Sequence, residues 1–228
     1  MMKDSSSETG KGFPLACIFD LDGVIVDTAA YHYEAWKRLA NSLGFDFTHE
    51  QNEQLKGISR MDSLDLVLGW GNTHKTDSEK ILLAQQKNSW YLELVSQMKP
   101  DEILPGVRQF IEELKAAGIR IALGSASKNS AEILKRTGIS DFFDAIVDGN
   151  SVARSKPDPE VFSRGAELLG FAPESCVVIE DAAAGIEAAH RAGMKVIGIG
   201  NPEVLKNADL VISDTQKLNI DDLKNLGR

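Results

Sequence analysis

The chain has 228 residues, of which 43% are hydrophobic and 26% are charged, as in an ordinary globular protein of one or two domains. Its formal net charge of −9 disfavours a nucleic-acid-binding protein, because such proteins normally present a positive surface. No apolar run is long enough to cross a membrane, so we expect no membrane partner either.

The chain begins with a segment, residues 1–12, that is rich in Ser, Lys and Gly and has no apolar stretch. It therefore differs from a secretory signal peptide, and we expect a disordered tail. The two cysteines, Cys17 and Cys176, lie in apolar runs, which predicts two small buried side chains and no disulfide. Together these features favour a cytoplasmic protein.

Short apolar runs alternate with amphipathic stretches along most of the chain. The runs predict buried strands at residues 15–19, 119–123, 145–147, 176–179 and 195–199, with a further edge strand at 209–212. Helical spacing of apolar residues predicts helices at 106–117, 129–137, 159–169 and 182–192, each followed by a glycine. This alternation predicts an α/β fold with a doubly wound, Rossmann-like parallel sheet.

The long stretch between the first and second strands has a different pattern, with helices expected at residues 31–43, 61–70 and 78–98 and no strand. We therefore predict an inserted all-helical cap domain over residues 30–103. The α/β catalytic core would comprise residues 13–29 and 104–228, and the linkers would lie near residues 27–30 and 99–106.

Two carboxylates, Asp20 and Asp22, directly follow the first strand. Ligands of parallel sheets bind beyond the carboxyl ends of the strands, so both residues lie where chemistry is expected. Two carboxylates this close repel each other unless a cation or a proton intervenes. The alternative is a pair of solvated, turn-forming side chains.

Further polar residues follow later strands. Ser125 would offer its hydroxyl and nearby backbone N–H groups to an anion at a helix N-terminus, or would simply be a helix N-cap. Lys156 lies in a segment stiffened by two prolines, and its alternative is an exposed surface lysine. Glu180 and Asp181 follow the strand at 176–179, where a helix dipole alone would also favour acidic residues.

The combination of these groups predicts a reaction class. Two acidic pairs without a His or Cys cluster are the oxygen ligands that Mg²⁺ prefers. Magnesium beside an anion pocket and a lysine indicates phosphoryl transfer. The chain has no G-x-x-x-x-G-K-[ST] run, so it is not a P-loop NTPase.

Four motifs resemble those of the haloacid dehalogenase superfamily in order and spacing: Asp20-Leu-Asp-Gly-Val24, Gly124-Ser-Ala-Ser127, Lys156-Pro157 and Glu180-Asp181. Dehalogenases of this superfamily lack the second aspartate, so Asp22 argues against that branch. The stretches 27–36, 52–60 with Asp62 and Ser63, and 125–129 resemble the β-phosphoglucomutase family. The resemblance extends from residue 13 to about residue 200.

This resemblance implies interconversion of β-glucose 1-phosphate and glucose 6-phosphate through β-glucose 1,6-bisphosphate. Asp20 would be the nucleophile that becomes phosphorylated, and Asp22 the general acid and base. Mg²⁺ would be held by Asp20, the backbone carbonyl of Asp22, Glu180 and Asp181. Lys156 and Ser125 would hold the oxygens of the transferring phosphoryl group.

The resemblance also implies roles for the cap. Thr28 would steer Asp22 as the cap closes, and it could also be the N-cap of the first helix of the cap domain. His32 would relay protons for Asp22 or position it. Arg60 would hold the distal phosphate, with help from Ser63 and Lys87. The implied substrate-binding residues are Trp36, Lys56, Gly57, Ile58, Ser59, Arg60, Ser63, Lys87, Ser125, Ala126, Ser127, Lys128 and Asn129.

Several alternatives stay open at this point. Trp36 has the position of a core aromatic as much as of a pocket wall, and Trp70, Trp90 and Phe110 are expected in the core. The remaining histidines, His49, His74 and His190, belong to no recognisable group of functional residues and are expected at the surface. A magnesium-dependent sugar-phosphate phosphatase and a catalytically silent binding protein are the alternative functions. We expect a monomer whose only partners are small sugar phosphates.

Overall fold

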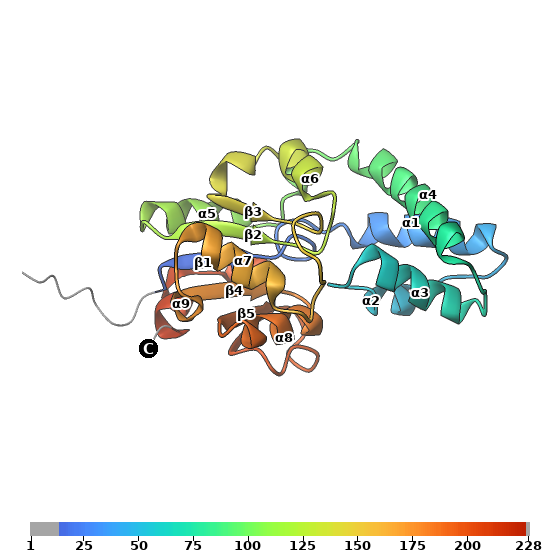
Figure 1. Ribbon diagram of the computed structural model, residues 1–228. Helices are drawn as coiled ribbons and strands as arrows, with labels where there is room; N and C mark the ends of the chain where they lie inside the picture. The colour runs from blue at the N-terminus through green and yellow to red at the C-terminus, as the bar shows by residue number, and fades with distance from the viewer. Residues whose placement is uncertain (1–13, 227–228) are drawn as a thin grey trace, which may run out of the picture.

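The computed structural model describes residues 14–226 and contains a six-stranded parallel sheet in the order β3-β2-β1-β4-β5-β6 (Figure 1). The strands are β1 (Ala16–Phe19), β2 (Arg120–Gly124), β3 (Ala145–Val147), β4 (Cys176–Glu180), β5 (Lys195–Ile199) and β6 (Leu210–Ile212). All six predicted strands are confirmed, including the edge strand, with ends that differ by at most one residue. The predicted tail, residues 1–12, lies outside the described residues.

Helices cover both faces of the sheet, as expected for a doubly wound fold. They are α5 (Val107–Ala116), α6 (Ser130–Thr137), α7 (Glu160–Leu169), α8 (Ala183–Arg191) and α9 (Ile220–Leu226), with 3₁₀ turns η1 (Pro100–Glu102), η2 (Ser140–Phe142), η3 (Pro173–Ser175) and η4 (Thr215–Lys217). The four predicted helices of this part are confirmed, whereas α9 has no counterpart among the predictions. It is a short helix of seven residues, too short for a clear apolar period.

The central position of strand β1 in the sheet explains why its residues are all apolar. Cys17 and Phe19 join a cluster with side chains of α5, α6 and α9 on one face. Ala16 and Ile18 join a second cluster, with α7 and α8, on the other face. A strand that is buried on both faces needs apolar residues at every position rather than at alternate ones. Cys17 and Cys176 are both buried and free, as predicted.

Four helices form a separate group beside the sheet, on the right in Figure 1. They are α1 (Ala29–Ser42), α2 (His49–Glu53), α3 (Arg60–Trp70) and α4 (Asp77–Val95). A third hydrophobic cluster, which includes Trp36, Leu39, Leu64 and Val67, holds them together. Helix α2 was not predicted, because its five residues contain no apolar side chain; Thr48 and Gln51 form a capping box that starts it.

The two connections between this helical group and the sheet lie side by side. Val26 and Ile103 form an antiparallel bridge, and the backbone N–H of Leu104 donates to the carbonyl oxygen of Ile25 at 2.9 Å. The chain therefore enters and leaves the helical group at one place, through two adjacent segments. Within residues 14–226, no helix is both long and apolar enough to cross a membrane.

The sheet topology brings the predicted site residues to one edge. Strand β1 pairs with β2 on one side and with β4 on the other, with Phe19 opposite both Leu123 and Ile179. This is the point at which the strand order reverses, and α/β folds bind ligands beyond the carboxyl ends of the strands there. Asp20, Ser125 and Asp181 each follow the last residue of one of these three strands.

Candidate active site

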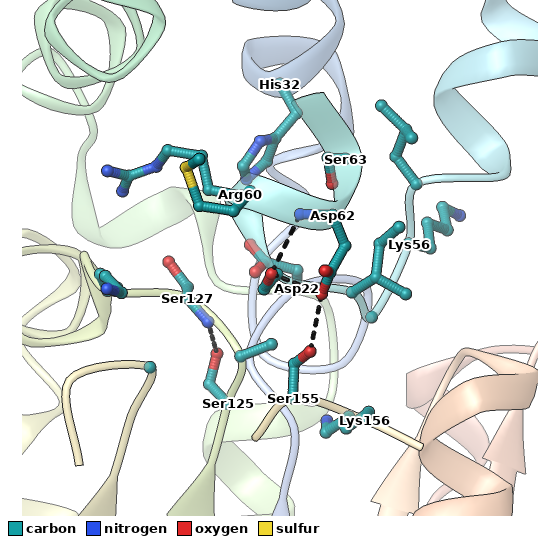
Figure 2. A pocket seen from close by; sticks show the side chains of 18 of the residues that line it. Asp22, His32, Lys56, Arg60, Asp62, Ser63, Ser125, Ser127, Ser155 and Lys156 are labelled. Carbon is teal, nitrogen blue, oxygen red and sulfur yellow. Dashed lines mark hydrogen bonds between the residues drawn. The ribbon is translucent and has the colours of Figure 1, made fainter. Parts of the chain in front are cut away.

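A cavity of about 860 Å³ lies between the helical group and the carboxyl ends of the strands. Every predicted site residue lines it except Glu180, which is fully buried. Figure 2 shows side chains of the helical group, such as Arg60 and His32, across the cavity from Ser125 and Lys156 of the α/β part. The volume is in the usual range for a small-molecule site.

Three carboxylates form a cluster at the sheet side of the cavity. Each of Asp20, Glu180 and Asp181 places one oxygen within 4.8 Å of the others. Burial raises the pKa of Asp181, and the charges of Glu180 and Asp20 raise it further. Burial is also the main cause of the raised pKa of Glu180. An all-oxygen cluster that is this crowded with like charge fits a hard divalent cation such as Mg²⁺.

Two glycines leave the space that this cluster occupies. A Cβ at Gly23 would lie 2.1 Å from Oδ2 of Asp181, and a Cβ at Gly185 would lie 1.8 Å from Oε1 of Glu180. Because real Cβ contacts are never so short, any larger residue at either position would displace a carboxylate. The backbone is thus shaped around the carboxylate cluster.

Lys156 is deeply buried between two of these carboxylates. Its Nζ lies 2.5 Å from Oδ1 of Asp20 and 2.7 Å from Oε1 of Glu180. Burial alone would lower the pKa of Lys156, but the charges of Asp20 and Glu180 outweigh burial and raise it. The alternative of an exposed lysine is therefore wrong, and a permanent positive charge lies next to Asp20.

Asp22 is not part of the carboxylate cluster, and its side chain accepts a hydrogen bond from the hydroxyl of Thr28. Thr28 is the N-cap residue of α1, as one interpretation of the sequence predicted, but its side chain makes no capping hydrogen bond. Burial, and then the charge of Asp20, raise the pKa of Asp22 to about 7. A carboxyl group with this pKa exchanges protons readily near neutral pH.

The segment after β2 forms a turn held by hydroxyl groups. The N–H of Ser127 donates to Oγ of Ser125 at 3.0 Å, and the N–H of Asn129 donates to Oγ of Ser127 at 3.2 Å. Helix α6 begins at Ser130, with Asn129 as its N-cap, so Ser125 is not a helix N-cap. The Ser125 hydroxyl instead lies five residues before the helix, at the end of the strand that borders Asp20.

A second polar group lies in the helical wall of the cavity. Nδ1 of His32 lies 2.8 Å from Nζ of Lys87, and the His32 ring packs on Tyr91 with centroids 4.2 Å apart. Burial lowers the pKa of His32, and Lys87 and Arg60 lower it further, so the ring is neutral. The hydrogen bond of His32 is with Lys87, and its relay role toward Asp22 stays a prediction.

Lys87 is a buried lysine that forms no salt bridge with the described residues. It is 2% exposed, and its Nζ lies 4.5 Å from the ring centroid of Trp36, which is both a core residue and a cavity wall. Among residues 14–226 no carboxylate lies within ion-pair distance of it. Burial, and then the charge of Arg60, lower the pKa of Lys87. A bound anion would remove this electrostatic cost.

The segment from Lys56 to Arg60 forms the start of α3 and its approach. The Lys56 amine lies 2.9 Å from Glu53 and 3.6 Å from Asp181, so it is held beside the carboxylate cluster. Arg60 is the first residue of α3, and Ser59 is its N-cap. The remaining predicted residues of this part, Gly57, Ile58 and Ser63, and those after β2, Ala126 and Lys128, line the cavity.

Sequence reasoning missed several residues near the site. Tyr91 supports the His32 ring, and Asn88 accepts a hydrogen bond from the Asn129 side chain at 2.9 Å. Each follows Lys87 on α4, but the stretch shows nothing that separates these residues from its other polar positions. His190 is exposed, as predicted, and its Nε2 lies 2.9 Å from Oδ2 of Asp209, outside the cavity. His49 stacks on Tyr33, with ring centroids 3.7 Å apart.

Comparison with known proteins agrees with this geometry. A model of haloacid dehalogenase-like hydrolases matches residues 14–193, most of the chain. The chain belongs to the haloacid dehalogenase-like hydrolase family. The description of this family names only a broad class of activity, hydrolase. The names of individual relatives indicate more specific reactions.

One such relative is the β-phosphoglucomutase of Bacillus subtilis, which is 44% identical over 90% of this chain and 92% of its own length. Another is a phosphorylated carbohydrates phosphatase of Thermotoga maritima, 32% identical over 80% of this chain and 83% of its own. Among solved structures, β-phosphoglucomutase from Clostridium difficile has a TM-score of 0.90 at 44% identity and covers 93% of this chain and 96% of its own.

Proposed function

We propose that this protein is an enzyme that interconverts β-glucose 1-phosphate and glucose 6-phosphate, the reaction of a β-phosphoglucomutase. The observation that carries the proposal is a single cavity with two opposed walls, one that carries the nucleophile and one that carries basic side chains. Asp20 lies on the sheet side, and Arg60 and Lys87 lie on the helical side. A sugar with a phosphate at each end needs both walls. The 44% identity to the Bacillus subtilis β-phosphoglucomutase supports the same reaction.

The chemistry begins at Asp20. A carboxylate oxygen of Asp20 attacks the phosphorus atom, the bond from phosphorus to the sugar oxygen breaks, and that oxygen takes a proton from Asp22. In the reverse direction, Asp22 removes a proton from a sugar hydroxyl as the hydroxyl oxygen attacks phosphorus and releases Asp20. Such a covalent step divides one difficult transfer into two easier ones. The pKa of Asp22, raised to about 7, suits both directions.

A magnesium ion fits the carboxylate cluster of Asp20, Glu180 and Asp181. We infer that these side chains and the backbone carbonyl of Asp22 hold it, where it would neutralise charge on the transferring phosphoryl group. Lys156, which contacts Asp20, would hold a phosphoryl oxygen together with Ser125.

The distal phosphate would occupy the helical side of the cavity. Arg60 offers a planar fork of N–H donors that matches phosphate geometry, and a bound phosphate would favour the charged form of Lys87. The neutral His32 ring holds the Lys87 amine in place. The turn at residues 125–129 faces the same space from the sheet side, so its polar groups would bind the sugar or either phosphate.

We further propose that residues 30–103 act as a cap that closes over the substrate. The paired connections at Val26 and Ile103 would be its hinge. A mutase must present both ends of the bisphosphate to Asp20 and must keep water from the phosphorylated aspartate, and an opening and closing cap does both. The proposal includes a monomeric, cytoplasmic enzyme that acts on small sugar phosphates.

The test is phosphorus NMR of the purified protein with Mg²⁺, β-glucose 1-phosphate and a trace of the bisphosphate. We expect conversion to glucose 6-phosphate that depends on the bisphosphate. Arg60→Ala should reduce isomerisation by about 10²-fold or more, and hydrolysis of a small phosphate ester far less, because only the bisphosphate has a distal phosphate. Arg38→Ala, an exposed arginine on α1, is the matched control.

A phosphatase acting on the same class of substrate is the second candidate, because the Thermotoga maritima relative carries that name. Inorganic phosphate as the main product, with no bisphosphate dependence, would favour it. Equal losses of isomerisation and ester hydrolysis in Arg60→Ala would also argue against the mutase.

A further inference from the structure

One hydrogen bond between the helical group and the α/β part involves residues that the proposed reaction does not use. The hydroxyl of Ser155 donates to Oδ2 of Asp62 at 3.0 Å, across 93 residues of sequence. Figure 2 shows this bond as a dashed line that spans the cavity wall between the start of α3 and the segment before α7. The bond exists only while these two parts of the molecule lie against each other.

The Asp62 carboxylate is held firmly on its own side. Its Oδ2 also accepts from the Ser59 hydroxyl at 2.6 Å, and its backbone N–H donates to the same hydroxyl at 3.2 Å. Asp62 is the third residue of α3, where the helix dipole favours a negative charge. Arg60 is the first residue of the same helix, so the orientation of Asp62 and that of Arg60 are set together.

On the α/β side of the bond, Ser155 is covalently next to Lys156. The carbonyl of Ser155 accepts from the N–H of Asp158 at 3.0 Å, which folds the segment into a turn. Lys156 in turn contacts Asp20 and Glu180. The bond between Ser155 and Asp62 thus connects Lys156 with Arg60. Lys156 is the residue after Ser155, and Arg60 lies two residues before Asp62 on α3.

We propose that Asp62 and Ser155 are positioning residues, and that their hydrogen bond sets the separation of Arg60 and Lys156 when the cavity is closed. The idea rests on the proposed function, since it assigns one phosphate of the bisphosphate to each of these cations. Phosphoryl transfer is sensitive to small misplacements of the substrate, which the separation of Arg60 and Lys156 would determine. Loss of the hydrogen bond between Asp62 and Ser155 therefore reduces turnover without removing any group that touches substrate. A bond to a charged acceptor is also stronger than one between neutral groups.

The experiment compares Ser155→Ala, Asp62→Asn and the double variant with the parent protein. Ser155→Ala is the cleaner change, because it leaves the bonds between Ser59 and Asp62 intact. We expect it to lower kcat/KM for isomerisation about ten-fold, which corresponds to about 1.4 kcal/mol of transition-state stabilisation. Hydrolysis of p-nitrophenyl phosphate should fall by a smaller factor, because that ester has a single phosphate.

Three comparisons separate positioning from a general loss of structure. The double variant should be no worse than the more impaired single variant, since both changes remove one bond. Ser155→Thr retains the hydroxyl and should recover isomerisation to within about three-fold of the parent, that is, within about 0.7 kcal/mol. Ser151→Ala removes a similar bond within the α/β part, from the Ser151 hydroxyl to Asp148 at 2.9 Å, and should have no effect.

Isomerisation by Ser155→Ala within two-fold of the parent, or additive losses in the double variant, would overturn the inference. So would equal losses of isomerisation and ester hydrolysis, which would mean that Ser155 acts only on neighbouring Lys156. Failure of the proposed function is a different result, because the parent itself would then release inorganic phosphate. In that case the inference falls with the proposed function, because a substrate with a single phosphate does not need Arg60 and Lys156 at a fixed separation.

Discussion

Asp22 combines a buried carboxyl group, a neighbouring carboxylate and one hydroxyl partner. Burial and the charge of Asp20 raise its pKa, and the hydroxyl of Thr28 acts in the opposite direction. Thr28 directly precedes α1, so the position of this helix determines whether Asp22 has a hydrogen-bond donor. A single residue next to the proposed hinge would therefore link the proposed proton transfer to the position of the proposed cap.

Asp22→Asn removes the exchangeable proton and retains an oxygen that can accept from Thr28. We expect isomerisation to fall by about 10²–10⁴-fold, the usual contribution of a general acid or base. Initial rates of glucose 6-phosphate formation check this, with thermal unfolding as the control for folding. A variant within ten-fold of the parent would show that another group transfers the proton.

Asp209 is an example of a charged residue with a structural role. Oδ1 contacts Nζ of Lys195 at 2.7 Å, and Oδ2 accepts from the N–H of Val196 at 3.0 Å and contacts His190. Burial alone would raise the pKa of Asp209, but these partners outweigh burial and lower it. A carboxylate whose pKa is lower in the folded state stabilises the fold above its unfolded pKa, and the stabilisation disappears as the pH falls through the folded value.

Asp209→Asn should therefore reduce the free energy of unfolding by about 1–2 kcal/mol at pH 7, from the loss of charged hydrogen bonds. The difference from the parent should shrink as the pH falls below about 4, where the unfolded carboxyl takes up a proton. Urea unfolding at pH 7, 5 and 3.5 measures it. Asp141→Asn, at an exposed position in η2, is the control, and a difference that does not depend on pH would contradict the argument.

Two helices contain a glycine in their interior, one packed against a carboxylate and the other in open space. Only the first is required by the packing around it. Gly185 lies in α8 against the Glu180 carboxylate, which also accepts from the N–H of Ala182 at 2.6 Å and from Lys156. Gly69 lies in α3, and a Cβ there would meet no atom within 4 Å. The sequence shows both simply as glycines inside helical patterns.

Gly185→Ala should displace Glu180 and weaken Mg²⁺ binding at least ten-fold, with a loss of stability of about 1–3 kcal/mol from overpacking. Gly69→Ala should leave Mg²⁺ binding unchanged and stabilise the protein by about 0.5–1 kcal/mol, because alanine loses less backbone entropy in a helix. Urea unfolding in EDTA and calorimetric Mg²⁺ titration test the pair. Equal Mg²⁺ affinities in the two variants would show that the cluster tolerates the displacement.

For the molecule as a whole, the carboxylate cluster is a source of repulsion that the amines of Lys156 and Lys56 offset in part. Lys156 lies against Asp20 and Glu180, whereas the only ion-pair partner of Asp181 among residues 14–226 is the more distant amine of Lys56. A ligand that binds the folded state alone stabilises it in proportion to the logarithm of its concentration over Kd. The fold and the proposed cofactor are therefore coupled.

We expect Mg²⁺ at a hundred times its Kd to stabilise the folded protein by about 2.7 kcal/mol, seen as a rise in Tm. Asp181→Asn removes one of three like charges, so its Tm in EDTA should equal or exceed that of the parent. Its response to Mg²⁺ should be largely lost. NaCl at the same ionic strength controls for general screening of the net negative charge, and an equal rise in both proteins would indicate such screening alone.

The strands, most helices and the principal polar residues of the site could be predicted because each depends on local pattern. A strand buried on both faces is apolar throughout, and the residue after it must lie at the edge of the sheet, as Asp20 and Asp181 do. Short helices such as α2 and α9 were missed, because five or seven residues show no period. These features are decided within a few consecutive residues.

The partners of those residues required the folded chain. The ion pair of Lys156 with Asp20 spans 136 residues, the contact of Lys87 with His32 spans 55, and the bond of Ser155 with Asp62 spans 93. No local pattern specifies which groups meet over such separations, and burial then decides their charge. The amino-acid sequence identified the chemistry at the strand ends, whereas packing of the helical group against the sheet placed Arg60, Lys87 and Asp62 opposite it.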